Sequence, residues 1–343
     1  MIDALASLAA MTQLRAGLAG LGMMGKNHAR VLQSMDNVEL VGAADGYGDR
    51  FGAMGDLPVF GSIDELIEHG IDLCVVALPT ETHLDAGLKL ASVGVHALIE
   101  KPLAMNVAEC DQLVAAFTEA GLIAAVGHIE RFNPALQAAR TRIEAGDLGD
   151  IYQVATRRQG PFPNRIRDVG VIKDLATHDV DLTAWVAGAP FAEITARVAH
   201  KSGREHEDMV AATGTLTSGV ITNHLVNWLS PMKERVTVIT GERGCFIADT
   251  LTADLTFCAN GEVPTEWDAV ANFRGVTEGD VTRLAIPKPE PLRVELEAFR
   301  DGILGKSDDY VPIGDGRLAV AVADACIASA ASGTTQAIPG ASA

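Results

Sequence analysis

The chain has 343 residues, a length typical of two domains, and 48% of its residues are hydrophobic against 21% charged. That is enough apolar material for a folded core, so a disordered chain, a collagen-like chain and a disulfide scaffold are excluded. The formal net charge of −18 argues against binding to nucleic acid or to an anionic membrane surface, because the mean field of the protein repels polyanions.

The first 13 residues are interpreted as an N-terminal extension, with Met1 or Met11 as the start of the protein. They contain Asp3 and no basic region, so they make no convincing signal peptide. No run approaches the roughly 18 uninterrupted apolar residues of a membrane span. The cysteines lie far apart, without a C-x-x-C pair, which favours a reduced cytoplasmic setting and no bound metal. They are Cys74, Cys110, Cys245, Cys258 and Cys326.

Residues 14–130 alternate short apolar runs with stretches of helical periodicity. Each run is bounded by Gly, Pro or a charge, which is typical of strands buried on both faces. The stretches between them, such as Ala108–Ala120, carry apolar residues at spacings of three and four. Strand–helix alternation predicts βαβ units and a Rossmann-type parallel sheet. The predicted strands are residues 14–20, 38–45, 73–79, 95–100 and 122–127.

After about Arg131 the pattern changes to that of an α+β domain over residues 131–333. A helix is predicted at Pro134–Ala145, followed by extended segments separated by turn signals such as Ser218-Gly219. These segments predict a largely antiparallel sheet. Two helices follow at residues 291–304 and 316–332, the last a candidate to pack back on the Rossmann domain, and residues 334–343 form a tail.

A G-x-G-x-x-G motif follows the first predicted strand and opens a helix. Asp45 lies 20 residues after its last glycine, at the end of the second predicted strand. In a Rossmann domain the glycines admit the pyrophosphate, the helix N-terminus supplies N–H donors, and the carboxylate binds the ribose hydroxyls. A plain glycine-rich turn is the alternative. The carboxylate would repel a 2′-phosphate, which favours NAD over NADP. The predicted cofactor residues here are Gly20, Gly22, Met23, Met24, Gly25 and Asp45.

Two further loops follow strands at the same predicted sheet edge, where ligands of open α/β sheets bind. Pro79, Thr80 and His83 are predicted to face the nicotinamide half of the cofactor, although Thr80 as a helix cap and His83 as a first-turn residue fit equally. Glu100 and Lys101 precede a proline. A partly desolvated lysine there could act on a substrate hydroxyl, and a surface lysine at a turn is the alternative.

Asp174 and His178 are spaced to share one helix face in the second domain. A carboxylate-paired histidine suits a general base that takes the hydroxyl proton as the hydride leaves the same carbon. A surface ion pair is the alternative. His128 and His224 are interpreted as packing or hydrogen-bonding residues, and no His, Cys or carboxylate set has metal-ligand spacing.

Five of the 27 basic residues fall within residues 157–173, where composition alone would place about one. Arginine recognises phosphate through paired hydrogen bonds, so Arg165 and Arg167 are predicted to bind a substrate phosphate. This cationic loop indicates an anionic substrate such as a nucleotide diphosphate sugar. The alternative is a solvated loop that balances nearby acids.

These motifs, in this order, resemble those of the Gfo/Idh/MocA oxidoreductase family over about residues 14–333. The resemblance implies a Rossmann domain, a C-terminal domain with an open, mostly antiparallel sheet, NAD(P), and dimers or tetramers built through those sheets. It also implies that Lys101, Asp174 and His178 are the catalytic set.

Within the family, GHIERFNP at 127–134 and the segment 157–182 resemble nucleotide-sugar 3-dehydrogenases such as those acting on UDP-N-acetylglucosamine. Arg131 and Asn133 are therefore predicted to contact substrate. An inositol or free-sugar dehydrogenase, or a 3-keto-sugar reductase, is the alternative within the family. A non-catalytic NAD(H)-sensing protein is the alternative of another class. NADP remains an alternative cofactor, because Asp45 is followed by glycine-rich sequence.

Overall fold

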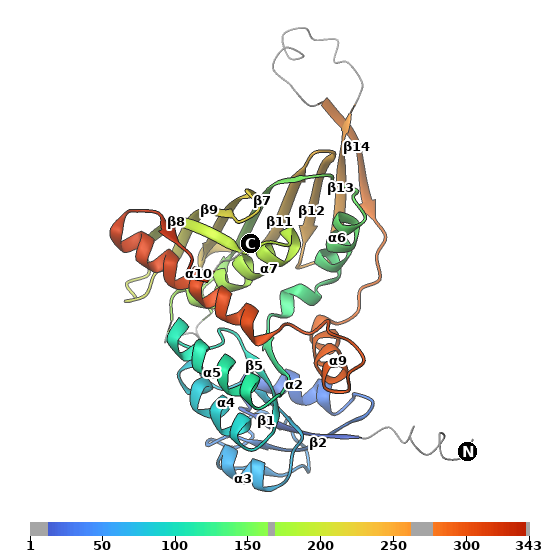
Figure 1. The fold of residues 1–343 in the computed structure, drawn as a ribbon, viewed down its shortest axis with the longest axis vertical. Coiled ribbons are helices and arrows are strands. Elements are labelled where there is room, and N and C mark those ends of the chain that lie inside the picture. The colour runs from blue at the N-terminus through green and yellow to red at the C-terminus, as the bar shows by residue number, and fades with distance from the viewer. Residues whose placement is uncertain (1–12, 164–168, 262–276, 341–343) are drawn as a thin grey trace, which may run out of the picture. The chain divides into compact units, whose positions relative to one another are not determined.

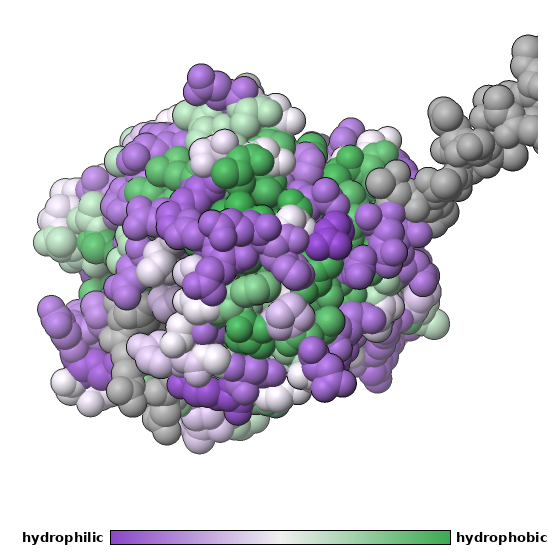
Figure 2. All heavy atoms as spheres, turned by 90° about the horizontal axis from the view of Figure 1, so that it is seen from below, coloured by the Kyte–Doolittle hydropathy of each residue, from purple (hydrophilic) through white to green (hydrophobic). Residues whose placement is uncertain are grey.

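The computed structural model describes residues 13–163, 169–261 and 277–340. The chain divides into two compact units, one of residues 1–128 with 292–317, the other of residues 129–291 with 318–343. The substrate domain was predicted over residues 131–333, but in the structure residues 292–317 belong to the first unit. Within the described ranges, no helix combines the length and apolarity needed to cross a membrane, and the face drawn in Figure 2 mixes hydrophilic with hydrophobic residues.

The first unit is a six-stranded parallel sheet of order β3-β2-β1-β4-β5-β6 with helices packed against it (Figure 1). This is the strand order of a doubly wound Rossmann domain, and it confirms the predicted fold class. All five predicted strands are present, and a sixth, β3, spans only two residues. The strands are β1 Leu14–Ala19, β2 Val38–Ala44, β3 Val59–Phe60, β4 Leu73–Val76, β5 His96–Glu100 and β6 Ala124–Gly127.

Two helices of the first unit, α3 and α5, begin at side chains that cap them. Ser62 Oγ accepts the N–H of Glu65, and Asn106 Oδ1 accepts the N–H of Glu109, as N-cap residues do. The helices are α2 Gly25–Leu32, α3 Ile63–Glu68, the 3₁₀ turn η2 Thr80–Thr82, α4 His83–Ser92, α5 Val107–Glu119 and α9 Pro291–Ile303.

Helix α9 is held to the first unit by arginines. Arg293 donates to Ser34 Oγ at 2.6 Å, and Arg300 donates to the carbonyl of Asp36 at 3.1 Å. The N–H of Val126 on β6 donates to the carbonyl of Val311 at 3.0 Å. Sequence periodicity identified α9 as a helix, but these long-range contacts decide which unit it joins.

The second unit is built on a nine-stranded, mostly antiparallel sheet of order β14-β13-β12-β11-β7-β10-β9-β8-β15, in which β7 and β10 pair in parallel. Ser218 and Gly219 form the predicted hairpin turn between β9 and β10, with Gly219 at φ +87°. The strands are β7 Ile151–Pro161, β8 Phe191–Ala199, β9 Met209–Leu216, β10 Ile221–Asn227, β11 Leu229–Gly241, β12 Gly244–Asp249, β13 Asp254–Gly261, β14 Thr277–Leu284 and β15 Gln336–Ala337.

Strand β15 lies in the segment predicted as a tail and pairs with β8 at the edge of this sheet. Helices α6 and α7 cover one face of the sheet (Figure 1). The helical elements are η3 Ile129–Phe132, α6 Pro134–Glu144, the π-helical turn η4 Ile172–Ala176, α7 Thr177–Ala187 and α10 Ile313–Ser332, whose first residues belong to the first unit.

Candidate active site

The glycine loop between β1 and α2 has the geometry of a dinucleotide-binding turn. Gly20 has φ +95°, and a Cβ there would lie 2.4 Å from the carbonyl oxygen of Ala77. A Cβ on Gly25 would lie 2.0 Å from the carbonyl oxygen of Gly20, whereas a Cβ on Gly22 would meet no atom within 4 Å. The first and third glycines thus serve packing. The second faces open space, as the close approach of a pyrophosphate to the backbone requires.

The start of α2 suits a phosphate. The helix has no side-chain N-cap and no acidic residue in its first turn, so no side chain of its own neutralises the positive end of the helix dipole. Met23 is exposed at this turn, and Met24 is half-buried.

Asp45 follows β2 and is tied to the same loop. Its Oδ2 accepts the N–H of Leu21 at 2.7 Å, and its Oδ1 accepts the N–H of Tyr47 at 2.8 Å. These bonds hold a half-buried carboxylate beside the glycine loop, where a ribose-binding acid is needed. The described loop, helix and carboxylate therefore fit an NAD-type dinucleotide.

His83 connects the two loops that follow β4 and β5. The ring is buried; its Nε2 lies 2.9 Å from the carbonyl oxygen of Leu78, and its Nδ1 lies 3.0 Å from that of Pro102. Burial lowers the pKa of His83, against the opposing effect of these hydrogen bonds. The alternative prediction made Thr80 a helix cap and His83 a first-turn residue. Thr80 begins η2 and does not act as a side-chain cap, whereas His83 is the first residue of α4.

Lys101 follows β5, and its peptide bond to Pro102 is cis. The preceding Glu100 is buried and anchored: His28 Nε2 lies 2.8 Å from its Oε1, and the N–H of Lys101 donates to its Oε2 at 3.2 Å. Burial alone would raise the pKa of Glu100, but the hydrogen bond and charge of His28, with the charge of Lys101, hold that pKa below its ordinary value.

Sequence reasoning missed His28. It comes three residues after Gly25 on the buried face of α2, where its bond to Glu100 joins the glycine-loop helix to the Lys101 loop. A histidine at a core-facing position of the cofactor helix was the available signal, but its partner lies 72 residues away.

Asp174 and His178 lie at consecutive turns of one helical segment in the second unit. Asp174 is buried in the π-helical turn η4, and His178 is half-buried at the start of α7. Glu207 holds the beginning of this segment, since its Oε1 accepts the N–H of Ile172 at 3.0 Å and its carbonyl accepts the N–H of Val171. π-Turns inside helices occur often at functional sites.

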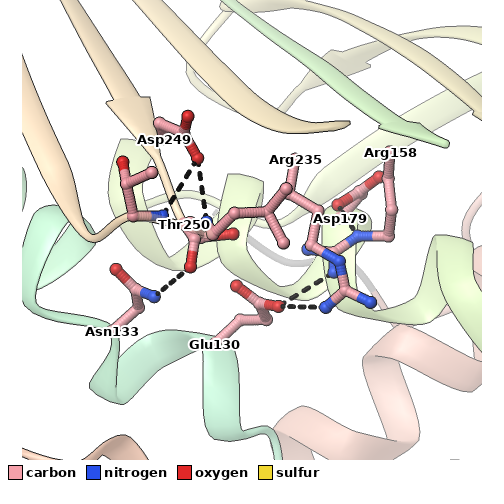
Figure 3. Close-up of polar contacts among 9 residues, drawn as sticks. Glu130, Asn133, Arg158, Asp179, Arg235, Asp249 and Thr250 are labelled. Carbon is pink, nitrogen blue, oxygen red and sulfur yellow. Dashed lines mark hydrogen bonds and ion pairs between the residues drawn. The ribbon is translucent and has the colours of Figure 1, made fainter. Parts of the chain in front are cut away.

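A buried ionic cluster fixes α7 to β7 and η3 (Figure 3). Arg158 Nε lies 2.7 Å from Asp179 Oδ1, and Arg158 Nη1 lies 2.8 Å from Glu130 Oε1. Arg235 of β11 reaches the same oxygen of Glu130 at 3.3 Å. Burial raises the pKa of Asp179. For Glu130 the effect of burial is outweighed by Arg158 and Arg235, which lower the pKa. Asp179, the residue next to His178, is therefore bound to the sheet through Arg158.

Arg131 and Asn133 both have contacts within the second unit. Arg131 donates two hydrogen bonds to the carboxylate of Asp181 of α7, from Nε at 2.9 Å and from Nη2 at 2.6 Å. Asn133 caps α6 by accepting the N–H of Ala135 at 3.0 Å and donates to the carbonyl of Thr250 at 3.0 Å (Figure 3). These contacts give both residues a structural role, and their contact with substrate stays a prediction.

The basic segment at 157–173 is less cationic than its composition indicated. Besides Arg158, Arg157 lies 3.2 Å from Glu234, and Lys173 lies 3.2 Å from Asp324. These three residues thus balance nearby acids, but the expected solvated loop is wrong for Arg157 and Arg158, which lie in β7, with Arg158 buried. Arg165 and Arg167 lie outside the described residues. No group of three or more His, Cys, Asp or Glu side chains is placed to hold a metal ion in the described ranges.

Residues 14–128 match the model of an oxidoreductase family with an NAD-binding Rossmann fold, GFO_IDH_MocA, and residues 136–247 match the C-terminal domain of the same family. The chain belongs to the Gfo/Idh/MocA oxidoreductase family, and its first unit is an NAD-binding Rossmann domain.

Among its relatives, the UDP-N-acetylglucosamine 3-dehydrogenase of Acidithiobacillus ferrooxidans is 33% identical over 216 residues, which cover 62% of this chain and 66% of that protein. A solved structure of that enzyme matches with a TM-score of 0.80 at 28% identity, covering 92% of this chain and 97% of that chain. The scyllo-inositol 2-dehydrogenase (NAD(+)) of Bacillus subtilis is 31% identical over 193 residues, 53% of this chain and 56% of that protein.

The WlbA dehydrogenase from Bordetella pertussis, solved with NADH and UDP-GlcNAcA, matches with a TM-score of 0.77 at 25% identity, covering 95% of this chain and 99% of that chain. By sequence, the chain spans about two thirds of the first of these curated relatives and just over half of the second.

Proposed function

We propose that this protein transfers a hydride between NAD and a sugar hydroxyl carbon, C3 of a UDP-N-acetylhexosamine. The observation that carries the proposal is the anchored Lys101 loop: the glycine-loop helix holds Glu100 through His28, and Glu100 holds the backbone of Lys101. The backbone that carries the Lys101 side chain is thereby held at the carboxyl end of β5, the sheet edge where a dinucleotide binds in this fold.

When bound, the nicotinamide supplies the hydride chemistry. In the proposed reaction Lys101 hydrogen-bonds the reacting oxygen and stabilises its developing negative charge. His178, oriented by Asp174, takes the hydroxyl proton as a general base. The buried Arg158–Asp179 pair supports this role, because it immobilises the helix that carries His178. The glycine loop and Asp45 hold the cofactor.

The choice of a nucleotide sugar is supported by the A. ferrooxidans relative and by the neighbour solved with UDP-GlcNAcA. The B. subtilis relative favours a second candidate, an inositol dehydrogenase. A homo-dimer or homo-tetramer and a cytoplasmic location stay predictions from the family resemblance and the cysteine pattern.

The test follows NADH formation with UDP-N-acetylglucosamine and with myo-inositol as alternative substrates. We expect turnover of the UDP-sugar, and turnover of the polyol alone would replace the first candidate by the second. Lys101→Ala and His178→Ala should each lower kcat by on the order of 10²–10⁴-fold. The matched controls are Lys89→Ala, an exposed lysine paired with Asp64, and His200→Ala, an exposed histidine. Undiminished turnover in both site variants would refute the catalytic assignment.

A further inference from the structure

Two cysteines lie directly opposite each other on neighbouring strands of the second unit. In the antiparallel pair β12–β13, Cys245 faces Cys258, and the flanking pairs Gly244–Ala259 and Phe246–Phe257 continue the same register. Facing residues of an antiparallel pair project to one face of the sheet with their Cβ atoms about 4.5–5.5 Å apart. The two thiols are therefore neighbours despite being 13 positions apart in sequence.

The opposite face of the strand pair fixes this register. Phe246 is completely buried, and its ring centroid lies 4.9 Å from that of Phe257. A slip of either strand by one residue would turn its ring toward solvent and its thiol toward the core, which makes the slip unfavourable. The pairing of Cys245 with Cys258 is thus a fixed feature of the fold.

These two cysteines also differ from the other three in exposure. Cys245 and Cys258 are half-exposed, whereas Cys74, Cys110 and Cys326 are buried. Burial raises the pKa of Cys74 and of Cys326 to about 12, which keeps both protonated and unreactive. Partial burial and the neighbouring Cys258 raise the pKa of Cys245 too, so exposure separates the facing pair from the buried cysteines. In the single chain, only the facing pair combines partial exposure with a second sulfur next to it.

We propose that Cys245 and Cys258 form an oxidation site, at which a small-molecule disulfide converts the two thiols into an intramolecular disulfide. Facing residues in antiparallel strands have Cα atoms about 4.5–5.5 Å apart, within the roughly 4.4–6.8 Å that a disulfide spans. Because a disulfide holds its Cβ atoms about 3.5–4.5 Å apart, the bond closes with a small local approach of the two strands. The inference is independent of the proposed enzymatic function.

The exchange balances in two steps. One protein thiolate attacks a sulfur of oxidised glutathione, forms a mixed disulfide and releases one reduced glutathione. The second protein thiolate attacks the protein sulfur of that mixed disulfide, forms the Cys245–Cys258 bond and releases the second reduced glutathione. The protein loses two electrons and its two thiol protons, which the two released glutathione molecules carry away.

The experiment incubates the full-length protein with oxidised glutathione and counts free thiols after denaturation. We expect the five thiols to fall to three, a non-reduced peptide joining Cys245 to Cys258, reversal by dithiothreitol, and a higher Tm because the cross-link constrains the unfolded chain. Cys245→Ser and Cys258→Ser should each lose the cross-link and stop at a glutathione adduct, whereas Cys110→Ser should still form it.

Five remaining thiols, adducts on wild-type protein without the cross-link, or a bond to any other cysteine would overturn the proposal. Disulfide-linked dimers on a non-reducing gel in place of the internal bond would do the same.

Discussion

His224 should make the free energy of unfolding depend on pH. Its ring is 3% exposed on β10, with Nδ1 2.8 Å from Thr156 Oγ1 and the Phe191 ring 5.8 Å away. Burial lowers the pKa of His224 from 6.5 to about 4. In the unfolded chain the same ring is solvated and titrates near its ordinary value of about 6.5.

The sign of the effect follows from proton binding. Between pH 6.5 and about 4 the unfolded chain binds a proton at His224 that the folded chain refuses, so acidification favours unfolding. The contribution of His224 to the free energy of unfolding is therefore fully present above its pKa in the unfolded chain, and it is lost as the pH falls toward 4. At about 1.4 kcal/mol per pKa unit, the whole difference corresponds to about 3 kcal/mol.

The assay compares urea unfolding of wild-type protein and His224→Gln at pH 7.5 and pH 4.5. Glutamine retains an amide that can bond Thr156 and does not titrate. Other titrating groups act equally in both proteins, so the difference between the two pH-induced losses isolates His224. We expect the wild type to lose about 2–3 kcal/mol more than the variant. His200→Gln, an exposed histidine, should behave like the wild type.

Equal losses in the wild type and in His224→Gln would refute the reasoning. That result would mean that the buried ring gains enough new contacts on protonation to compensate for its desolvation.

Three further predictions concern the described site. Gly22→Ala should keep the wild-type Tm but weaken NADH binding, seen by cofactor fluorescence, whereas Gly25→Ala should lower the Tm because its Cβ would lie 2.0 Å from a carbonyl oxygen. His28→Leu should destabilise the protein by about 3–5 kcal/mol in urea unfolding by leaving Glu100 buried without its partner, and His28→Gln should recover part of this loss. Arg158→Met should lower the free energy of unfolding by a similar amount. An unchanged unfolding midpoint would contradict the inference that the ionic cluster stabilises the fold.

Much of the first unit was predictable because its signals are local. A strand buried on both faces needs a continuous apolar run, and all five runs became strands of the parallel sheet. The two-residue strand β3 was missed because it is too short to show periodicity. Residues 291–304 were recognised as helical, but the bonds from Arg293 and Arg300 that place α9 in the first unit span more than 250 residues.

The candidate site shows the same division. The glycine motif, Asp45 and Lys101 were found because their spacing follows from one local turn geometry each. His28 and Glu207 were missed because a side chain that anchors another has no spacing rule when its partner is distant. Arg131 was assigned to substrate, and the structure shows its guanidinium in a buried bond with Asp181, which sequence could not reveal.

The sequence by itself determined the strand–helix alternation of the first unit, the dinucleotide-binding turn and the resemblance to an oxidoreductase family, because periodicity, turn chemistry and motifs act over a few residues. Tertiary structure alone decided which charges are buried in pairs, which unit α9 joins and that Cys245 faces Cys258. Those outcomes depend on contacts between distant segments, whose free energies arise only when the chain has folded and water is excluded from them.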